Sequence, residues 1–135
     1  MGPDVHFRRT YALALEAGFG LDDAELVALA DVGFDERYPA RRSLVNITRH
    51  FAPWAWLWSE YYLHRAMRDR DLVALGWSLH TAQDAIAHGF LGEKHILLRL
   101  GLGRDPDVWE GAPSGVRRRI EATTRARLRR WAASG

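Results

Sequence analysis

The sequence predicts an all-α fold: a single domain over residues 1–135, built as a bundle of about six to seven helices. Apolar residues recur at helical spacing along most of the chain, and glycines and prolines separate these stretches without gathering into a linker. No segment requires a β-sheet. The 135 residues are enough to bury one core, and a second domain is not expected.

The expected helices follow from this apolar spacing and from their start and stop residues. They run from Asp4 to Gly18 or Gly20, from Asp22 past Phe34, from Arg41 to Phe51, from Trp54 to Asp69, from Asp71 to His88, from about Leu91 to Leu100, and from Pro113 to Trp131. The second start is the clearest, because Asp22 can cap the helix and Glu25 lies three residues later, as in a capping box. Leu21 and Leu26 can add a hydrophobic staple.

Residues 54–58 hold three tryptophans at alternate positions, a spacing typical of a strand. The residues that follow are helical in composition, so we predict a helix. Its tryptophans are expected to pack in the core or to form the interface of a homo-oligomer. His64 lies four residues after Glu60 in a charged stretch and is expected to be a surface salt-bridge partner.

Composition excludes several kinds of site. The chain has no cysteine, so disulfides, thiolate metal sites and cysteine nucleophiles are ruled out, and a metal would have to be held by imidazole and carboxylate groups. These donors favour zinc, with manganese and iron as alternatives. No signal peptide and no apolar run of about 20 residues is found, so we expect a soluble, cytoplasmic protein without a membrane span.

The last 23 residues are basic, with seven arginines against Glu121 alone. Such a segment can bind phosphates or nucleic acid. The arginines surround the predicted helix instead of forming one stripe, so a solvated helix face is the favoured interpretation and a nucleic-acid partner is the less favoured one.

The most informative pattern is HxxxDxxxH, formed by His80, Asp84 and His88. At four-residue intervals the three side chains share one helix face, because each step drifts by only about 40°. His80 and His88 are separated by about 12 Å along the axis, so one ion cannot take both. The spacing therefore indicates that Asp84 bridges two ions roughly 3.5 to 4 Å apart, as in two-metal hydrolases.

Such a site in the core of the bundle needs donors from other helices. His6, His50 and an aspartate, either Asp31 or Asp35, are the candidates, and Asp31 lies on or beside the apolar face of its helix. A lone histidine on an apolar face is more often a hydrogen-bonded core residue. The pattern around Asp84 argues otherwise, since burying two imidazoles and a carboxylate without a cation is costly.

Three segments carry a resemblance to a known family: LHTAQDAIAHGF at residues 79–90, HFRRTYALALEAGF at residues 6–19 and RHF at residues 49–51. Together they resemble the zinc-dependent phospholipases C and single-strand-specific nucleases, over about residues 6 to 95, and the chain is most similar to compact bacterial members of that superfamily. The resemblance implies a helical bundle whose three-zinc cluster hydrolyses phosphodiesters or phosphomonoesters, and for this chain we expect two or three ions.

The resemblance also assigns roles to individual residues. It makes His6 a ligand from the N-terminal helix, His50 and His80 ligands of a shared ion, Asp84 the bridging carboxylate, and His88 the ligand of the remaining ion. Asp35, or failing that Asp31, would lie near the bridging water as ligand or base. One metal position stays unassigned, and Glu93 and His95 are its candidates.

We therefore expect a metal-dependent hydrolase that acts on a small phosphorylated substrate. The alternative is a non-catalytic helical protein with a structural or sensory metal site, which binds a partner through its Trp-rich or Arg-rich surface. No HExxH, no ExxH pair of di-iron bundles, no P-loop and no dinucleotide fingerprint occurs, which excludes these other enzyme classes.

Overall fold

The computed structural model describes residues 2–135, which form helices and no strand, as the sequence predicted. The elements in chain order are the π-helix η1 (Asp4–Arg9), α1 (Thr10–Glu16), α2 (Leu21–Arg37), the 3-10 helix η2 (Ala40–Arg42), α3 (Leu44–His50), α4 (Trp54–Asp69), α5 (Leu72–His88), α6 (Glu93–Arg99) and α7 (Ser114–Ala133). None of these helices combines the length and the apolar character that a bilayer span requires.

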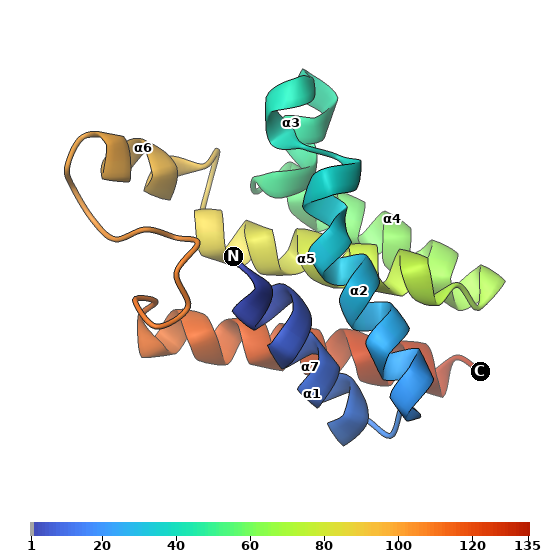
Figure 1. The fold of residues 1–135 in the computed structure, drawn as a ribbon. Helices are drawn as coiled ribbons and strands as arrows, with labels where there is room; N and C mark the ends of the chain where they lie inside the picture. The colour runs from blue at the N-terminus through green and yellow to red at the C-terminus, as the bar shows by residue number, and fades with distance from the viewer. Residues whose placement is uncertain (1) are drawn as a thin grey trace.

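Helix α5 is the centre of the bundle. It packs against α4, α2 and α7, and Figure 1 shows it crossing the middle of the molecule, with α7 below it and α6 standing off to one side. Of its 17 residues, 14 are buried. A helix that is covered on all sides can keep polar side chains only if other helices supply their partners.

Two apolar clusters hold α5 at its two ends. One surrounds Leu75 and Leu79 and includes side chains of α1, α2, α4 and α7. The other surrounds Ile86 and Ala87 and includes Trp109 from the loop before α7. These contacts fix the helix that carries HxxxDxxxH relative to its neighbours.

The ends of α5 confirm the start and stop signals in the sequence. The Asp71 carboxylate accepts hydrogen bonds from the backbone amides of Val73 and Ala74, so it caps the helix. Gly89 follows the last turn with φ of 76°, a conformation that favours glycine. Helix α4 also has the predicted bounds.

Two predicted helix starts are wrong. Helix α2 begins at Leu21 with Gly20 as its cap, so Asp22 already lies within the first turn, where its side chain makes no capping bond. Leu21 and Leu26, the residues of the predicted staple, are both exposed. The stretch predicted as one helix from Arg41 to Phe51 is divided, because the Ser43 hydroxyl accepts the amide hydrogen of Asn46 and starts α3 anew.

A glycine lets α5 and α2 approach each other. A Cβ atom at Gly76 would lie 2.5 Å from Cβ of Ala30, 2.6 Å from the carbonyl oxygen of Val27 and 2.9 Å from the backbone nitrogen of Asp31. Because these neighbours are backbone atoms or a methyl group attached directly to it, they cannot rotate away. The close contact sets the distance between Asp31 and the face of α5 that bears His80.

Gly76→Ala is therefore expected to lower the free energy of unfolding by about 1–3 kcal/mol through overpacking. The measurement is the midpoint of urea denaturation. Gly33→Ala, in α2, is the matched control, because a Cβ there meets nothing within 4 Å, and it should stabilise the helix by up to about 1 kcal/mol. Equal midpoints for the two variants would show that the close approach carries no energetic weight.

Candidate metal centre

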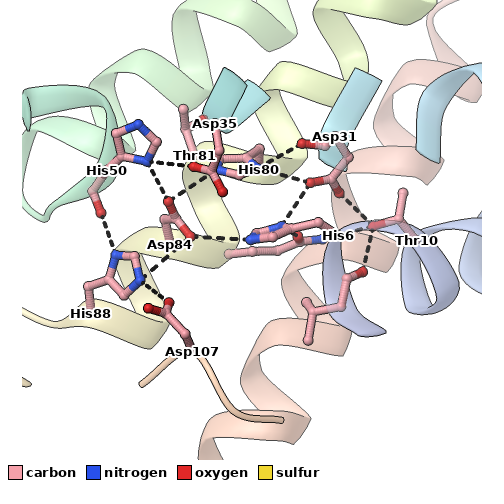
Figure 2. Close-up of polar contacts among 12 residues, drawn as sticks. His6, Thr10, Asp31, Asp35, His50, His80, Thr81, Asp84, His88 and Asp107 are labelled. Atoms are coloured by element: carbon pink, nitrogen blue, oxygen red, sulfur yellow. Dashed lines mark hydrogen bonds and ion pairs between the residues drawn. The ribbon is translucent and has the colours of Figure 1, made fainter. Parts of the chain in front are cut away.

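The structure brings the sequence-predicted site residues into one cluster (Figure 2). They come from η1, α2, α3 and α5, four elements that are separate in the chain, and they are His6, Asp31, Asp35, His50, His80, Asp84 and His88. All are buried except Asp35, whose side chain is 56% exposed. Four imidazoles and two carboxylates therefore share the interior of the bundle.

Asp84 lies at the middle of this cluster, with two histidines on each carboxylate oxygen. Its Oδ2 atom is 2.7 Å from Nδ1 of His50 and 3.1 Å from Nε2 of His80. Its Oδ1 atom is 3.4 Å from Nε2 of His6 and 3.9 Å from Nε2 of His88. A carboxylate between two pairs of nitrogen donors has the geometry of a bridging ligand.

In two of these rings, the nitrogen that points away from Asp84, here called the outer nitrogen, faces a backbone carbonyl oxygen. Such an oxygen can only accept a hydrogen bond. Nε2 of His50 lies 2.7 Å from the carbonyl oxygen of Tyr38, and Nδ1 of His80 lies 2.8 Å from the carbonyl oxygen of Asp31. Each outer nitrogen must therefore be the donor. In the neutral ring the inner nitrogen, the one toward Asp84, then carries the lone pair.

The other two rings follow the same rule. Nδ1 of His6 donates toward Oδ1 of Asp31 at 2.9 Å and Oε1 of Gln83 at 2.7 Å. Nδ1 of His88 lies 3.2 Å from the carbonyl oxygen of His50. His6, His50 and His80 thus have an N–H directed outward and their inner nitrogen directed at Asp84, whereas Nε2 of His88 lies nearer to Oδ1 of Asp107, at 2.8 Å, than to Oδ1 of Asp84, at 3.9 Å.

Lone pairs that face a carboxylate repel it unless a proton or a metal ion lies between them. Burial by itself lowers the pKa of His80, but the charge of Asp84 and hydrogen bonds with Asp31, Asp35 and Asp84 outweigh it and raise that pKa well above its usual value. Burial likewise raises the pKa of Asp84, yet the charges of His80 and His88 and the hydrogen bond from His50 hold it well below its usual value. The cluster therefore favours positive charge, which protons or a divalent cation can supply.

One group of four donors fits a single ion. Atoms of Asp35, His50, His80 and Asp84 lie within 4.8 Å of one another. Oδ1 of Asp35 is 3.1 Å from Nε2 of His80 and 3.4 Å from Nδ1 of His50. Tetrahedral zinc with bonds of about 2.0 Å holds its donors about 3.3 Å apart, so these distances suit zinc with small adjustments.

A second group lies on the other side of Asp84. His88, His95 and Asp107 form it, with Nε2 of His88 2.8 Å from Oδ1 of Asp107 and Nε2 of His95 3.6 Å from Oδ2. The hydrogen bond from His88 lowers the pKa of Asp107, which keeps this carboxylate ionised. Burial and the charge of His88 lower the pKa of His95, which favours the neutral ring that a metal requires.

Sequence reasoning did not find Asp107. It lies in the loop between α6 and α7, where no periodicity relates it to the other donors, and only the fold brings it to His88. Of the two candidates for the unassigned metal position, His95 joins this group, whereas Glu93 belongs to none of the donor groups among the described residues.

Asp31 contacts the ring nitrogens of His6 and His80 that point away from Asp84, so it lies behind the rings as seen from the centre of the cluster. Its Oδ2 atom accepts a hydrogen bond of 2.6 Å from the Thr10 hydroxyl, and its Oδ1 atom lies 2.9 Å from Nδ1 of His6 and 3.3 Å from Nδ1 of His80. A carboxylate in this place orients the imidazoles and raises their basicity toward a metal. Asp31 also forms a compact donor group with His6 and His80, but it contacts the nitrogens that point away from Asp84. Beside Asp84, Asp35 is therefore the nearer candidate for ligand or base, and Asp31 suits a positioning residue.

A stacked arginine fixes the position of His50. The guanidinium carbon of Arg49 lies 4.4 Å from the ring centroid of Tyr38 and 4.1 Å from that of Trp58, and Nε donates to the hydroxyl of Tyr62. The carbonyl of Tyr38 accepts the outer N–H of His50. By holding Tyr38 in place, Arg49 therefore helps to orient His50, a candidate ligand.

Arg49→Ala is expected to weaken metal binding about 10–100-fold, the range seen when residues that orient a ligand are removed. Competition with a colorimetric chelator measures the affinity. Arg49→Lys keeps the charge without the planar stack and should recover only part of it. Arg37→Ala is the control, since Arg37 contacts the same tyrosine ring only at 5.7 Å; equal losses in both alanine variants would contradict the proposed coupling.

Other sequence features take ordinary positions in the fold. His64 is exposed and lies 4.0 Å from Glu60, as predicted. Three arginines of α7 form ion pairs with acidic side chains of α1, α4 or α7: Arg125, Arg127 and Arg130. Trp58 donates to the Thr48 hydroxyl, whereas Trp54 is 41% exposed, so the predicted homo-oligomer through this segment stays a prediction.

The donor cluster is open to the outside on one face. A pocket of about 300 Å³ reaches it, and its polar lining consists of Asp35, His50, Asp84, His88, His95 and Asp107. A substrate or a water molecule can therefore reach both groups of donors. Comparisons of the chain with protein-family models, with curated proteins and with solved structures found no match.

Proposed function

We propose that this protein is a metal-dependent hydrolase of phosphate esters, with two ions bridged by Asp84. One observation carries the proposal: three buried histidines, His6, His50 and His80, direct their outer N–H groups at acceptors and their inner nitrogens at one carboxylate. The fourth, His88, lies between that carboxylate and Asp107. Zinc suits this set of nitrogen and oxygen donors, and manganese and iron are the alternatives.

The two sides of Asp84 define the two ligand sets. His50, His80 and Asp35 would complete the first with Oδ2 of Asp84. On the other side of Asp84, His6 and His88 would contribute to the second with Oδ1, and Asp107, which lies 2.8 Å from His88, would be a further donor. His95 lies near enough to contribute to a third ion or to replace a ligand.

Ions held by these residues would supply Lewis acidity, which activates water and neutralises charge on phosphoryl oxygens. The protein supplies the geometry: Asp31 orients two imidazoles from behind, and the half-exposed Asp35 stands at the mouth of the pocket, where it can take a proton from water. Partial burial raises the pKa of Asp35, but its hydrogen bond with His80 and the charge of that ring lower it overall, so the carboxylate is ionised and able to act as ligand or base.

Phosphate esters are the proposed substrates for two reasons. Paired divalent ions suit an anionic group with several oxygens. The resemblance of residues 6–95 to the zinc-dependent phospholipases C and single-strand-specific nucleases points to the same chemistry, and the size of the pocket, about 300 Å³, suits a small phosphorylated molecule.

The alternative is a structural or sensory metal site. The first ligand set favours it, because its four protein donors would close a tetrahedral ion without leaving a position for water. The exposure of Asp35 favours catalysis instead, since this ligand can leave or exchange. The two functions differ in one measurable property, the presence of an exchangeable water on the bound metal.

Asp35→Asn is expected to lower kcat by about 10²–10⁴, the range for loss of a general base, when it is measured at metal concentrations that saturate the site. Zinc-loaded and manganese-loaded proteins are assayed against a panel of phosphomonoesters and phosphodiesters, with metal content measured by mass spectrometry. Asp23→Asn, an exposed acid in the first turn of α2, should behave like the wild type.

Failure of the hydrolase proposal would be clear from the same assay. If loaded wild-type protein hydrolyses no ester of the panel and His80→Ala behaves identically, the proposed activity is wrong. A large drop in melting temperature on chelation would then favour the structural site.

A further inference from the structure

A second, wider groove lies beside the pocket of the donor cluster. Its volume is about 620 Å³, and its lining consists of Asp35, Glu36, Pro39, Ala40, Arg41 and Arg42. It shares Asp35 and Ala40 with the pocket that reaches the histidines. The two spaces are therefore neighbours, and Asp35 stands between them.

Two arginines line this groove, Arg41 and Arg42. Neither Arg41 nor Arg42 forms an ion pair within the part of the chain that the structure describes, and both are exposed. Several arginines of α7, in contrast, are paired with acids. Exposed guanidinium groups that have no acidic partner are suited to bind phosphate or carboxylate oxygens through paired hydrogen bonds.

The segment that carries these arginines is tied to the candidate metal ligands. The carbonyl of Tyr38 accepts the outer N–H of His50, and the carbonyl of Pro39 accepts hydrogen bonds from the Asn46 side chain and from the backbone amide of Arg42. These three hydrogen bonds hold the segment just before η2. The arginines are thus attached to a backbone whose position is set by a ligand of the centre.

We propose that Arg41 and Arg42 form a second anion subsite, and that the substrate carries another anionic group next to the phosphate that is hydrolysed. This inference rests on the proposed function, because the metal centre would hold the first anionic group. Glu36 lines the same groove and opposes an anion there, so its charge reduces the affinity of the subsite.

Binding of non-hydrolysable phosphonates to the zinc-loaded protein tests the inference. Isothermal titration calorimetry compares propylphosphonate, which has one anionic group, with two alkane bisphosphonates that have three-carbon and five-carbon linkers. We expect at least one bisphosphonate to bind wild-type protein about tenfold more tightly than propylphosphonate, the effect of one added charge-assisted contact. In the double variant Arg41→Ala/Arg42→Ala, the two affinities should become nearly equal.

Two further variants sharpen the result. Arg37→Ala removes an exposed arginine that does not line the groove and should keep the wild-type preference. Glu36→Gln should increase the preference severalfold, because it removes the opposing charge. All these side chains are exposed, and matching circular dichroism melts verify that the variants fold.

The possible failures are distinguishable. If wild-type protein binds propylphosphonate in a chelator-sensitive way but shows no preference for either bisphosphonate, or if the double variant keeps the preference, the subsite is refuted and the proposed function stands. If zinc-loaded wild-type protein binds none of the three phosphonates, both the proposed function and the subsite are refuted.

Discussion

Replacing Asp84 with asparagine is expected to abolish binding of both metal ions and, with it, hydrolysis. Asp84 is 1% exposed and is the only one of the four first-set donors that also faces His6 and His88. An amide has no charge and offers one oxygen instead of two, so it cannot bridge. We expect a loss of metal affinity greater than about 100-fold, which exceeds the effect of removing a residue that only orients a ligand. Mass spectrometry of the native protein counts the ions directly.

The matched comparison is Asp31→Asn. It changes an equally buried aspartate that contacts two of the same rings from behind, so it should weaken binding about 10–100-fold and still allow two ions at high metal concentration. If Asp84→Asn retains two ions per chain, or if Asp31→Asn is the more damaging variant, the assignment of bridging and positioning roles is wrong.

Chelation is expected to lower the melting temperature, and the difference between loaded and chelated protein should widen as the pH rises. In the metal-free protein the pKa of His80 is well above its usual value of 6.5, so the protonated ring stabilises the fold below about pH 6.5. This contribution is lost as the pH rises through the raised pKa. The metal requires neutral rings, so its own contribution grows over the same range.

Asp84 also stabilises the metal-free protein, but its contribution has the opposite pH dependence. Because its pKa is well below the usual 3.8, the ionised carboxylate stabilises the fold above about pH 4, and this contribution is lost only as the pH falls through the lowered pKa. Between about pH 4 and 6.5 the metal-free protein therefore keeps both contributions. The effect of chelation should be smallest in that interval.

The size of the shift follows from ligand linkage. Free zinc at a thousand times its dissociation constant stabilises the native state by about 4 kcal/mol per site, which corresponds to roughly 10–20 °C for a chain of this length. Scanning calorimetry at pH 6 and pH 8, with zinc or with a chelator, gives both differences. If chelation does not lower the melting temperature, or lowers it less at pH 8 than at pH 6, the result would contradict a buried metal centre built from these histidines.

The helices were predictable where a local signal sets them. Asp71 and Gly89 enclose α5 because a capping carboxylate and a left-handed glycine act within one turn of the chain. The predicted start of α2 failed at Asp22 for a related reason: a side chain can cap only from the residue before the first turn, and the backbone at Gly20 already occupies that place. The choice between two adjacent starts depends on packing as well as on the cap.

The site was predictable only in part. His80, Asp84 and His88 are neighbours because helix geometry alone places residues four apart on one face. The roles of Asp31 and Asp35 could not be separated in this way, since both belong to the same helix one turn apart. Their difference appears only when α5 packs at Gly76, which leaves Asp31 behind the rings and Asp35 at the pocket mouth.

By itself, then, the sequence determined an all-helical chain and a helix with two imidazoles and a carboxylate on one face, because period, capping and turn chemistry act over a few residues. Only the tertiary structure decided that α5 is the central helix, that Asp107 joins His88, and which nitrogen of each imidazole faces Asp84. These features depend on carbonyl oxygens and side chains far away in the chain, and no local spacing encodes where such atoms meet.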